Sequence, residues 1–320
     1  MEINKINAND SYKNNKSNIN EREVNENCMN TLPKHGAGNL EGNIVTSQLD
    51  HVRQTVDDDE LSVQPLKIEY NAYRSVKSFN SRIRFIVMHY TALNFKDSVN
   101  ALTGNSVSAH YLVPDPTEQS YIDAGFNNMR VFNLVDEKER AWHAGNSSWA
   151  NRTNINDTSI GIEIVNLASD DGHGNITYPA FNAVQVNTVK ALALNIIQRY
   201  PDITPVNIVG HSDIAPGRKN DPGAAFPWEE LYASGIGAWF DQRTKEKYES
   251  QFQQALPAER EIILKLKEYG YDVTDADSEK GRQGLIRAFQ LHFRQSDYSG
   301  IIDIETAAIL YALVEKYFHK

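Results

Sequence analysis

Cysteine is almost absent from this sequence of 320 residues, because Cys28 is the only one. A single cysteine excludes an internal disulfide framework, and it excludes the cysteine pairs that zinc knuckles and dithiol redox motifs require. Apolar runs of about 18 residues are also missing, so we expect no membrane-spanning segment. The first residues turn polar at once and lack the apolar core of a secretory signal, which predicts a cytoplasmic protein or an unusual export route.

Basic residues are also few relative to acidic ones. The 42 acidic residues outnumber the 32 basic ones, which gives a formal net charge of −10. Nucleic acids and anionic membrane surfaces reward clustered lysine and arginine, so we expect neither as the main partner. At roughly 150 residues per domain, the length predicts about two domains.

The chain changes character along its length. Residues 1–64 form a polar, asparagine-rich leader that we expect to be disordered, because its apolar area is too small to offset its chain entropy. Residues 65–240 mix short apolar runs with one strong helical pattern, which predicts an α/β domain with a mixed central β-sheet flanked by helices. A polar connector follows over residues 241–256, and residues 257–320 predict a small three-helix domain.

Individual elements can be predicted from hydrophobic periodicity and turn residues. Residues 109–113 and 119–122 flank a Pro-Asp-Pro turn, which predicts a β-hairpin. The other expected strands are 84–89, 159–165 and 207–210, and the expected helices are 181–200, 259–269, 281–294 and 305–318.

Two histidines, His89 and His211, each stand at the C-terminal end of an apolar strand, where α/β sheets usually place their sites. Asp221 lies ten residues after His211, in a loop that prolines and glycines restrict. Two imidazoles and one carboxylate would form a three-ligand zinc site whose fourth position is open to water. The alternative is that each histidine is a buried structural residue.

Glu163 and Lys219 add two charged groups to this candidate site. Glu163 lies between apolar residues of an expected strand, and we interpret it as a general base with a raised pKa; simple alternation toward solvent is the alternative. Lys219 precedes Asp221 by two residues and is interpreted as a cation that stabilises an oxyanion, or else as a surface charge. A metal, a base and a cation together predict metal-assisted amide hydrolysis.

Five motifs occur in a characteristic order: VMHYTA at 87–92, SAHY at 108–111, AWHAG at 141–145, GIE at 161–163, and the loop 211–223. Together they resemble the zinc-dependent N-acetylmuramoyl-L-alanine amidases of type 2, relatives of the peptidoglycan recognition proteins and the phage lysozyme-type amidases. The resemblance implies that one zinc ion binds His89, His211 and Asp221, that Glu163 is the catalytic base, and that Lys219 assists at the oxyanion.

The same resemblance points to three substrate-binding residues. Trp142 and His143 match the family's substrate groove, and a tryptophan face suits stacking on a sugar ring, although core packing explains it equally well. Arg218 is interpreted as a partner for a carboxylate of the stem peptide, with an exposed loop charge as the alternative.

The C-terminal region carries a second resemblance. GLIRAFQ at 284–290 and GIIDIET at 300–306 are similar to the small three-helix peptidoglycan-binding domain. A wall-binding domain favours the periplasm or cell envelope, as an alternative to the cytoplasm.

Taken together, the resemblances imply hydrolysis of the amide bond between N-acetylmuramic acid and L-alanine in peptidoglycan or muropeptides, during cell-wall turnover or recycling. Two alternatives stay open: a module that binds peptidoglycan without cutting it, and a different zinc peptidase. No oligomeric state is predicted.

Overall fold

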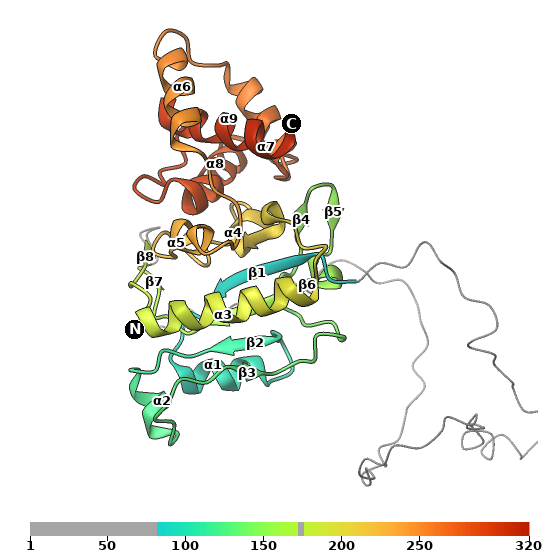
Figure 1. Ribbon diagram of the computed structural model, residues 1–320, viewed down its shortest axis with the longest axis vertical. Coiled ribbons are helices and arrows are strands. Elements are labelled where there is room, and N and C mark those ends of the chain that lie inside the picture. The colour runs from blue at the N-terminus through green and yellow to red at the C-terminus, as the bar shows by residue number, and fades with distance from the viewer. Residues whose placement is uncertain (1–81, 172–175, 320) are drawn as a thin grey trace, which may run out of the picture. The chain divides into compact units, whose positions relative to one another are not determined.

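The computed structural model describes residues 82–171 and 176–319 (Figure 1). The predicted leader over residues 1–64 therefore lies outside the described residues, as does the start of the predicted α/β domain. Within the described ranges, every helix is too short or too polar to cross a membrane.

A mixed sheet of five strands forms the centre of the fold, in the order β3-β2-β6-β1-β9. The strands are β1 (Phe85–Tyr90), β2 (Tyr111–Val113), β3 (Phe132–Asn133), β6 (Ser159–Ile164) and β9 (Ile208–Gly210). Four of them run parallel and β3 pairs antiparallel with β2, which confirms the predicted mixed sheet. The strands β1 and β6 are almost fully buried because both faces of the sheet are covered.

Helices flank this sheet, again as predicted. Helix α3 (Ala183–Arg199) buries a stripe that includes Val189, Ala193 and Ile196 in the main hydrophobic core (Figure 1). Helices α1 (Phe95–Leu102) and α2 (Gln119–Asp123) contribute to a second, smaller apolar cluster. The short elements are β4 (Ser148–Trp149), β5 (Arg152–Thr153), β7 (Ser169–Asp170), β8 (Ile176–Thr177), α4 (His211–Ile214), α5 (Trp228–Ala233), and the 3-10 helices Ile155–Thr158 and Pro205–Asn207.

The predicted hairpin over residues 109–113 and 119–122 is wrong in its second half, which forms helix α2. Glu118 caps this helix, since its carboxylate accepts a hydrogen bond from the Ser120 backbone N–H at 2.9 Å. The same carboxylate accepts from the Phe95 N–H at 3.0 Å and so joins the starts of α1 and α2. Strand β2 pairs with β3 instead.

The C-terminal region contains four helices, α6 (Gln242–Phe252), α7 (Glu259–Tyr269), α8 (Glu279–Phe293) and α9 (Ile304–Phe318). The last three confirm the helices predicted there to within two residues. The segment predicted as a connector contains α6, which packs along α9, with Phe252 edge-on to Tyr311 at 5.0 Å. The predicted domain boundaries stay predictions.

Helix α8 is joined to the α/β region through Asp213 in α4. This fully buried carboxylate accepts hydrogen bonds from the Tyr271 hydroxyl at 2.6 Å and from the Gly210 N–H at 2.7 Å, and it lies 2.7 Å from His292 Nδ1. One hydrophobic core contains residues of both regions. The C-terminal helices therefore pack directly against the short helix that begins at His211.

A second carboxylate, Glu137, ties β2 to the C-terminal end of α3. Glu137 accepts hydrogen bonds from the Arg199 guanidinium and from the hydroxyls of Tyr111 at 2.7 Å and Tyr200 at 2.8 Å. Burial alone would raise the pKa of Glu137, but these donors lower it to about 2. Because the folded pKa lies below the unfolded value, the carboxylate stabilises the fold above about pH 4.5, and this contribution is lost as the pH falls toward 2.

We expect Glu137→Gln to lower the free energy of unfolding by about 2 kcal/mol at neutral pH, and by clearly less near pH 3, where the wild-type carboxyl is already losing this advantage. Urea unfolding at the two pH values measures the difference. Glu139→Gln, which removes the same charge from an exposed neighbour, is the control and should change little. An equal loss for Glu137→Gln at both pH values would contradict the assignment.

Candidate metal centre and active site

Three donor atoms converge at the C-terminal edge of the sheet. His89 Nδ1 lies 2.8 Å from Asp221 Oδ2, His211 Nδ1 lies 3.0 Å from the same oxygen, and the two ring nitrogens are 3.1 Å apart. The three side chains are buried. The sheet order explains the meeting of the histidines, because His89 is near the end of β1 and His211 follows the neighbouring strand β9 directly.

The loop after α4 folds back to bring Asp221 to the histidines. The Ser212 N–H donates to the Asp221 carbonyl at 2.9 Å, which closes the loop on itself. Gly210 makes this closure possible, since a Cβ there would lie 2.6 Å from the Pro222 ring. A side chain at position 210 would therefore displace the segment that carries Asp221.

In His89 and His211, the hydrogen bond made by Nε2 determines which ring nitrogen is left to face the centre. His211 Nε2 lies 3.1 Å from the Ala144 carbonyl, which accepts a hydrogen bond, so Nε2 carries the proton and Nδ1 has a free lone pair. The assignment follows from the hydrogen-bond network.

His89 is oriented by a chain of hydrogen bonds that runs through His143. The Ser159 hydroxyl donates to the Ile155 carbonyl at 2.7 Å and accepts from His143 Nε2 at 3.1 Å. His143 Nδ1 then accepts from His89 Nε2 at 3.0 Å. His89 Nδ1 is thus left with a lone pair that points toward Asp221 and His211.

This arrangement fits a zinc ion. Two nitrogen lone pairs and a carboxylate oxygen face one another. Such a group favours a cation bound between its members. Their separations are a few tenths of an ångström below the roughly 3.3 Å edge of a tetrahedron with zinc–nitrogen bonds of about 2.0–2.1 Å. Among the described residues, no other group of histidine, cysteine and acidic side chains has donors placed to hold a metal.

Asp221 carries its negative charge at neutral pH. Burial opposes ionisation, but the imidazoles of His211 and His89 beside the carboxylate hold the pKa of Asp221 well below its usual range. Burial lowers the pKa of His89 to about 4, although the nearby Asp221 carboxylate acts in the opposite direction. A carboxylate anion and a neutral imidazole are the protonation states that bind a metal.

Glu163 lies beside this centre and not on a solvent face. It is paired with His89 in the register of β6 and β1, and its Oε1 is 4.0 Å from His89 Nδ1. Only 14% of its side chain is exposed, and Oε2 is buried with no hydrogen-bond partner among the described residues. Burial, and then the charge of Asp221, raise the pKa of Glu163 well above its usual value. An unpaired carboxylate oxygen next to the centre suits a group that accepts a proton from water.

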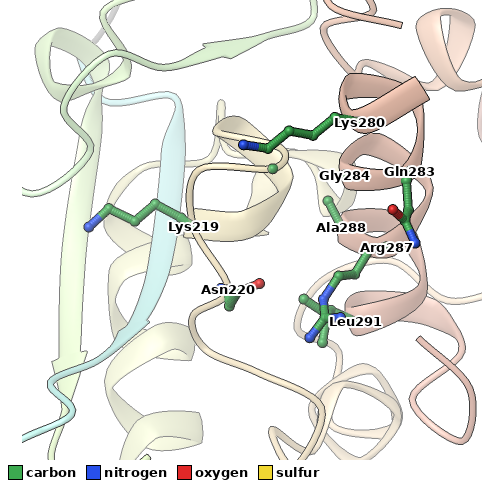
Figure 2. Close-up of a pocket in the computed structure, with 9 residues that line it drawn as sticks. Lys219, Asn220, Lys280, Gln283, Gly284, Arg287, Ala288 and Leu291 are labelled. Carbon is green, nitrogen blue, oxygen red and sulfur yellow. The ribbon is translucent and has the colours of Figure 1, made fainter. Parts of the chain in front are cut away.

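Lys219 stands on the loop that carries Asp221. Its charge partly counteracts the raised pKa of Glu163 and contributes to the lowered pKa of His89, so its field reaches both groups. Figure 2 shows its side chain directed away from α8 and toward the strands. A cation at this place is suited to an oxyanion, and that role stays a prediction.

The other three predicted residues occupy different environments. Trp142 is 62% exposed, with the Arg140 guanidinium 4.3 Å from its ring centroid, so it is not a core residue. His143 is buried behind His89, whereas Arg218 is exposed and donates hydrogen bonds to the carbonyls of Ala144 at 3.0 Å and Asn146 at 2.5 Å. Substrate contacts by these residues stay predictions.

Sequence reasoning missed two contributions to the site. Ser159 has no recognisable signal, since a serine at the start of a strand is ordinary. His143 does have a signal, its place in the AWHAG motif, but the motif does not reveal that its ring contacts His89.

We expect His143→Ala to weaken zinc binding about 10- to 100-fold, because His89 loses the partner that fixes its tautomer. Ser159→Ala should weaken zinc binding in the same direction, since it removes the acceptor for His143 Nε2. Zinc affinity is measured by competition with a chromophoric chelator. His110→Ala is the control, because His110 is also buried but its ring nitrogens contact the Gly161 N–H and the Glu139 carbonyl. Unchanged zinc affinity in both test variants would contradict this role.

Comparisons with known proteins agree with the geometry. Residues 79–224 match a family model described as N-acetylmuramoyl-L-alanine amidase. The chain is 42% identical over 246 residues to the N-acetylmuramoyl-L-alanine amidase AmiD of Escherichia coli (strain K12). The aligned region covers 76% of this chain and 87% of AmiD.

Two solved structures extend the similarity to most of the fold. AmpDh3 from Pseudomonas aeruginosa, solved in complex with anhydromuramic pentapeptide, has a TM-score of 0.76 and 54% identity, over 79% of this chain and 99% of its own. E. coli AmiD in complex with the substrate anhydro-N-acetylmuramic acid-L-Ala-D-gamma-Glu-L-Lys has a TM-score of 0.69 and 39% identity. The match covers 79% of this chain and 98% of the AmiD chain.

Proposed function

The chain belongs to the N-acetylmuramoyl-L-alanine amidase family, and we propose that it cleaves muropeptides at a zinc centre held by His89, His211 and Asp221. It hydrolyses the amide bond between N-acetylmuramic acid and L-alanine, in the turnover and recycling of cell-wall material. The observation that carries the proposal for the site is the convergence of the three donor atoms within 2.8–3.1 Å, beside a buried carboxylate of Glu163.

The roles of the protein groups follow from their positions. Zinc, when bound, supplies a Lewis acid that polarises the scissile carbonyl and makes water more acidic. Glu163 accepts the proton of the attacking water while the hydroxyl adds to the carbonyl carbon. Lys219 stabilises the negative charge that develops on the carbonyl oxygen. The C–N bond then breaks, and Glu163 returns the proton to the nitrogen of L-alanine, which its raised pKa favours.

Product analysis tests the proposed function. Zinc-loaded protein is incubated with anhydro-N-acetylmuramic acid-L-Ala-D-γ-Glu-L-Lys, and the products are weighed by mass spectrometry. We expect the free tripeptide and the free anhydro sugar acid. A product that retains L-alanine on the sugar would identify a different zinc peptidase, and tight binding without any product would identify a recognition module.

A further inference from the structure

A positively charged cleft lies beside the metal centre, between the loop that carries Asp221 and helix α8. Its volume is about 210 Å³, which leaves room for about one amino-acid residue. Lys219 and Asn220 line it from the loop, and Lys280 and Arg287 line it from α8. Figure 2 shows the two α8 side chains extending from the helix into the gap that faces the loop.

The charge of this cleft is unusual for a protein with a net charge of −10. No carboxylate lines it. Lys280 and Arg287 extend into it from α8, whereas the side chain of Lys219, which also lines it, is directed away from α8 (Figure 2). None of the three belongs to an ion pair with a carboxylate within residues 82–171 and 176–319. Arg287 is half-buried and its guanidinium lies 5.2 Å from the ring centroid of Tyr298. Like charges held together in a partly dry site repel one another, so the cleft favours an anion.

The position of the cleft relative to the metal centre is fixed by close packing. A Cβ on Gly284 of α8 would lie 2.7 Å from the Cα of Gly217, so the helix rests directly on the loop backbone. The buried contacts of Asp213 with Tyr271 and His292 hold the same two segments together. A ligand in the cleft touches Asn220, the residue next to Asp221, and is therefore adjacent to the centre.

We propose that this cleft binds a carboxylate of the stem peptide of the muropeptide, and that α8 thereby contributes to substrate recognition. The inference rests on the proposed function, in which the leaving group is a peptide that starts with L-alanine. A γ-linked glutamate at the second position carries a free α-carboxylate two residues from the scissile bond, and the last residue carries another. The planar guanidinium of Arg287 matches a carboxylate, and Lys280 adds a mobile point charge.

Kinetics of a charge-neutralised variant test the proposal. The double variant Lys280→Gln/Arg287→Gln is compared with wild type on anhydro-N-acetylmuramic acid-L-Ala-D-γ-Glu-L-Lys and on two analogues. One analogue has the α-carboxylate of glutamate amidated, and the other has the terminal carboxylate amidated. We expect the double variant to raise KM about 10- to 100-fold on the unmodified substrate with kcat nearly unchanged, because the contact forms in both the ground and transition states.

The analogues identify the carboxylate. Amidation at the correct position should raise KM of the wild type by a similar factor and should leave KM of the double variant unchanged. Arg243→Gln/Arg260→Gln is the matched control, because it removes the same charge from two exposed arginines outside the cleft. The proposal is overturned if KM of the double variant stays at the wild-type value, if the variant still discriminates between the substrates, or if the control raises KM equally.

Equilibrium binding separates this proposal from the proposed function. Zinc-loaded Glu163→Gln is titrated with the same three compounds, with and without the two cleft substitutions, so that affinities are obtained without cleavage. If the wild type releases no product but the cleft substitutions still weaken binding of the carboxylate form, the proposed function fails and the cleft proposal stands. If the wild type cleaves and neither KM nor affinity depends on the cleft, only the cleft proposal fails.

Discussion

Replacing Glu163 by glutamine is expected to lower kcat for muropeptide cleavage about 10²- to 10⁴-fold, the usual contribution of a positioned general base. Glutamine keeps the size of the side chain but accepts no proton from water, and it returns none to the leaving nitrogen. Zinc content and KM should stay near the wild-type values, because Glu163 is not one of the proposed ligands and its Oε1 is 4.0 Å from His89 Nδ1. Steady-state kinetics with metal analysis on the same preparation measures all three quantities.

The pH profile gives this substitution a second readout. The base is active when deprotonated, so the activity of the wild type falls as the pH drops through the pKa of Glu163, which burial raises. The fall in activity at low pH that is due to this group should be absent from the pH–activity profile of Glu163→Gln. Cleavage within a few-fold of wild type, with this fall in activity retained, would show that another group is the base.

Asp221→Asn is expected to have an effect of similar or larger size, through loss of the metal. The substitution removes the only anionic donor of the proposed ligand set and leaves two imidazoles, so zinc affinity should fall at least 100-fold and cleavage at equimolar zinc should become undetectable. Isothermal titration with zinc and a cleavage assay measure the two losses. Asp202→Asn is the control, because it removes the same charge from an exposed carboxylate that pairs with Arg84. Wild-type zinc affinity in Asp221→Asn would exclude Asp221 as a ligand.

The positions of His89 and His211 were accessible from the sequence because strand ends are local features. Two apolar runs of strand length predict strands of an α/β sheet, and such sheets usually place their sites at the C-terminal strand ends. Asp221 was accessible for a related reason, since prolines and glycines restrict its loop. Glu163 was ambiguous from sequence, because alternation along a strand does not determine which face is buried; its 14% exposure and its pairing with His89 decide the question.

Features that depend on side-chain contacts between residues far apart in the sequence could not be predicted from the sequence. The contact of His143 with His89 joins residues 54 positions apart, and a sequence motif does not determine ring orientation. Residues 119–123 form a helix and not the predicted strand, because the contact of Glu118 with the distant Phe95 N–H, which joins the starts of α1 and α2, is not visible in local periodicity. Lys280 and Arg287 look like ordinary surface charges until α8 is placed against the loop at Gly217.

The central claim is that amide hydrolysis depends on one zinc ion bound at His89, His211 and Asp221. Its most direct test is a zinc titration of metal-free protein in which bound zinc and the rate of muropeptide cleavage are measured on the same samples. We predict no cleavage without metal, a linear rise in rate, and saturation at one zinc per chain. Cleavage by the metal-free protein, or a rate that does not follow the occupancy of a single site, would contradict the claim.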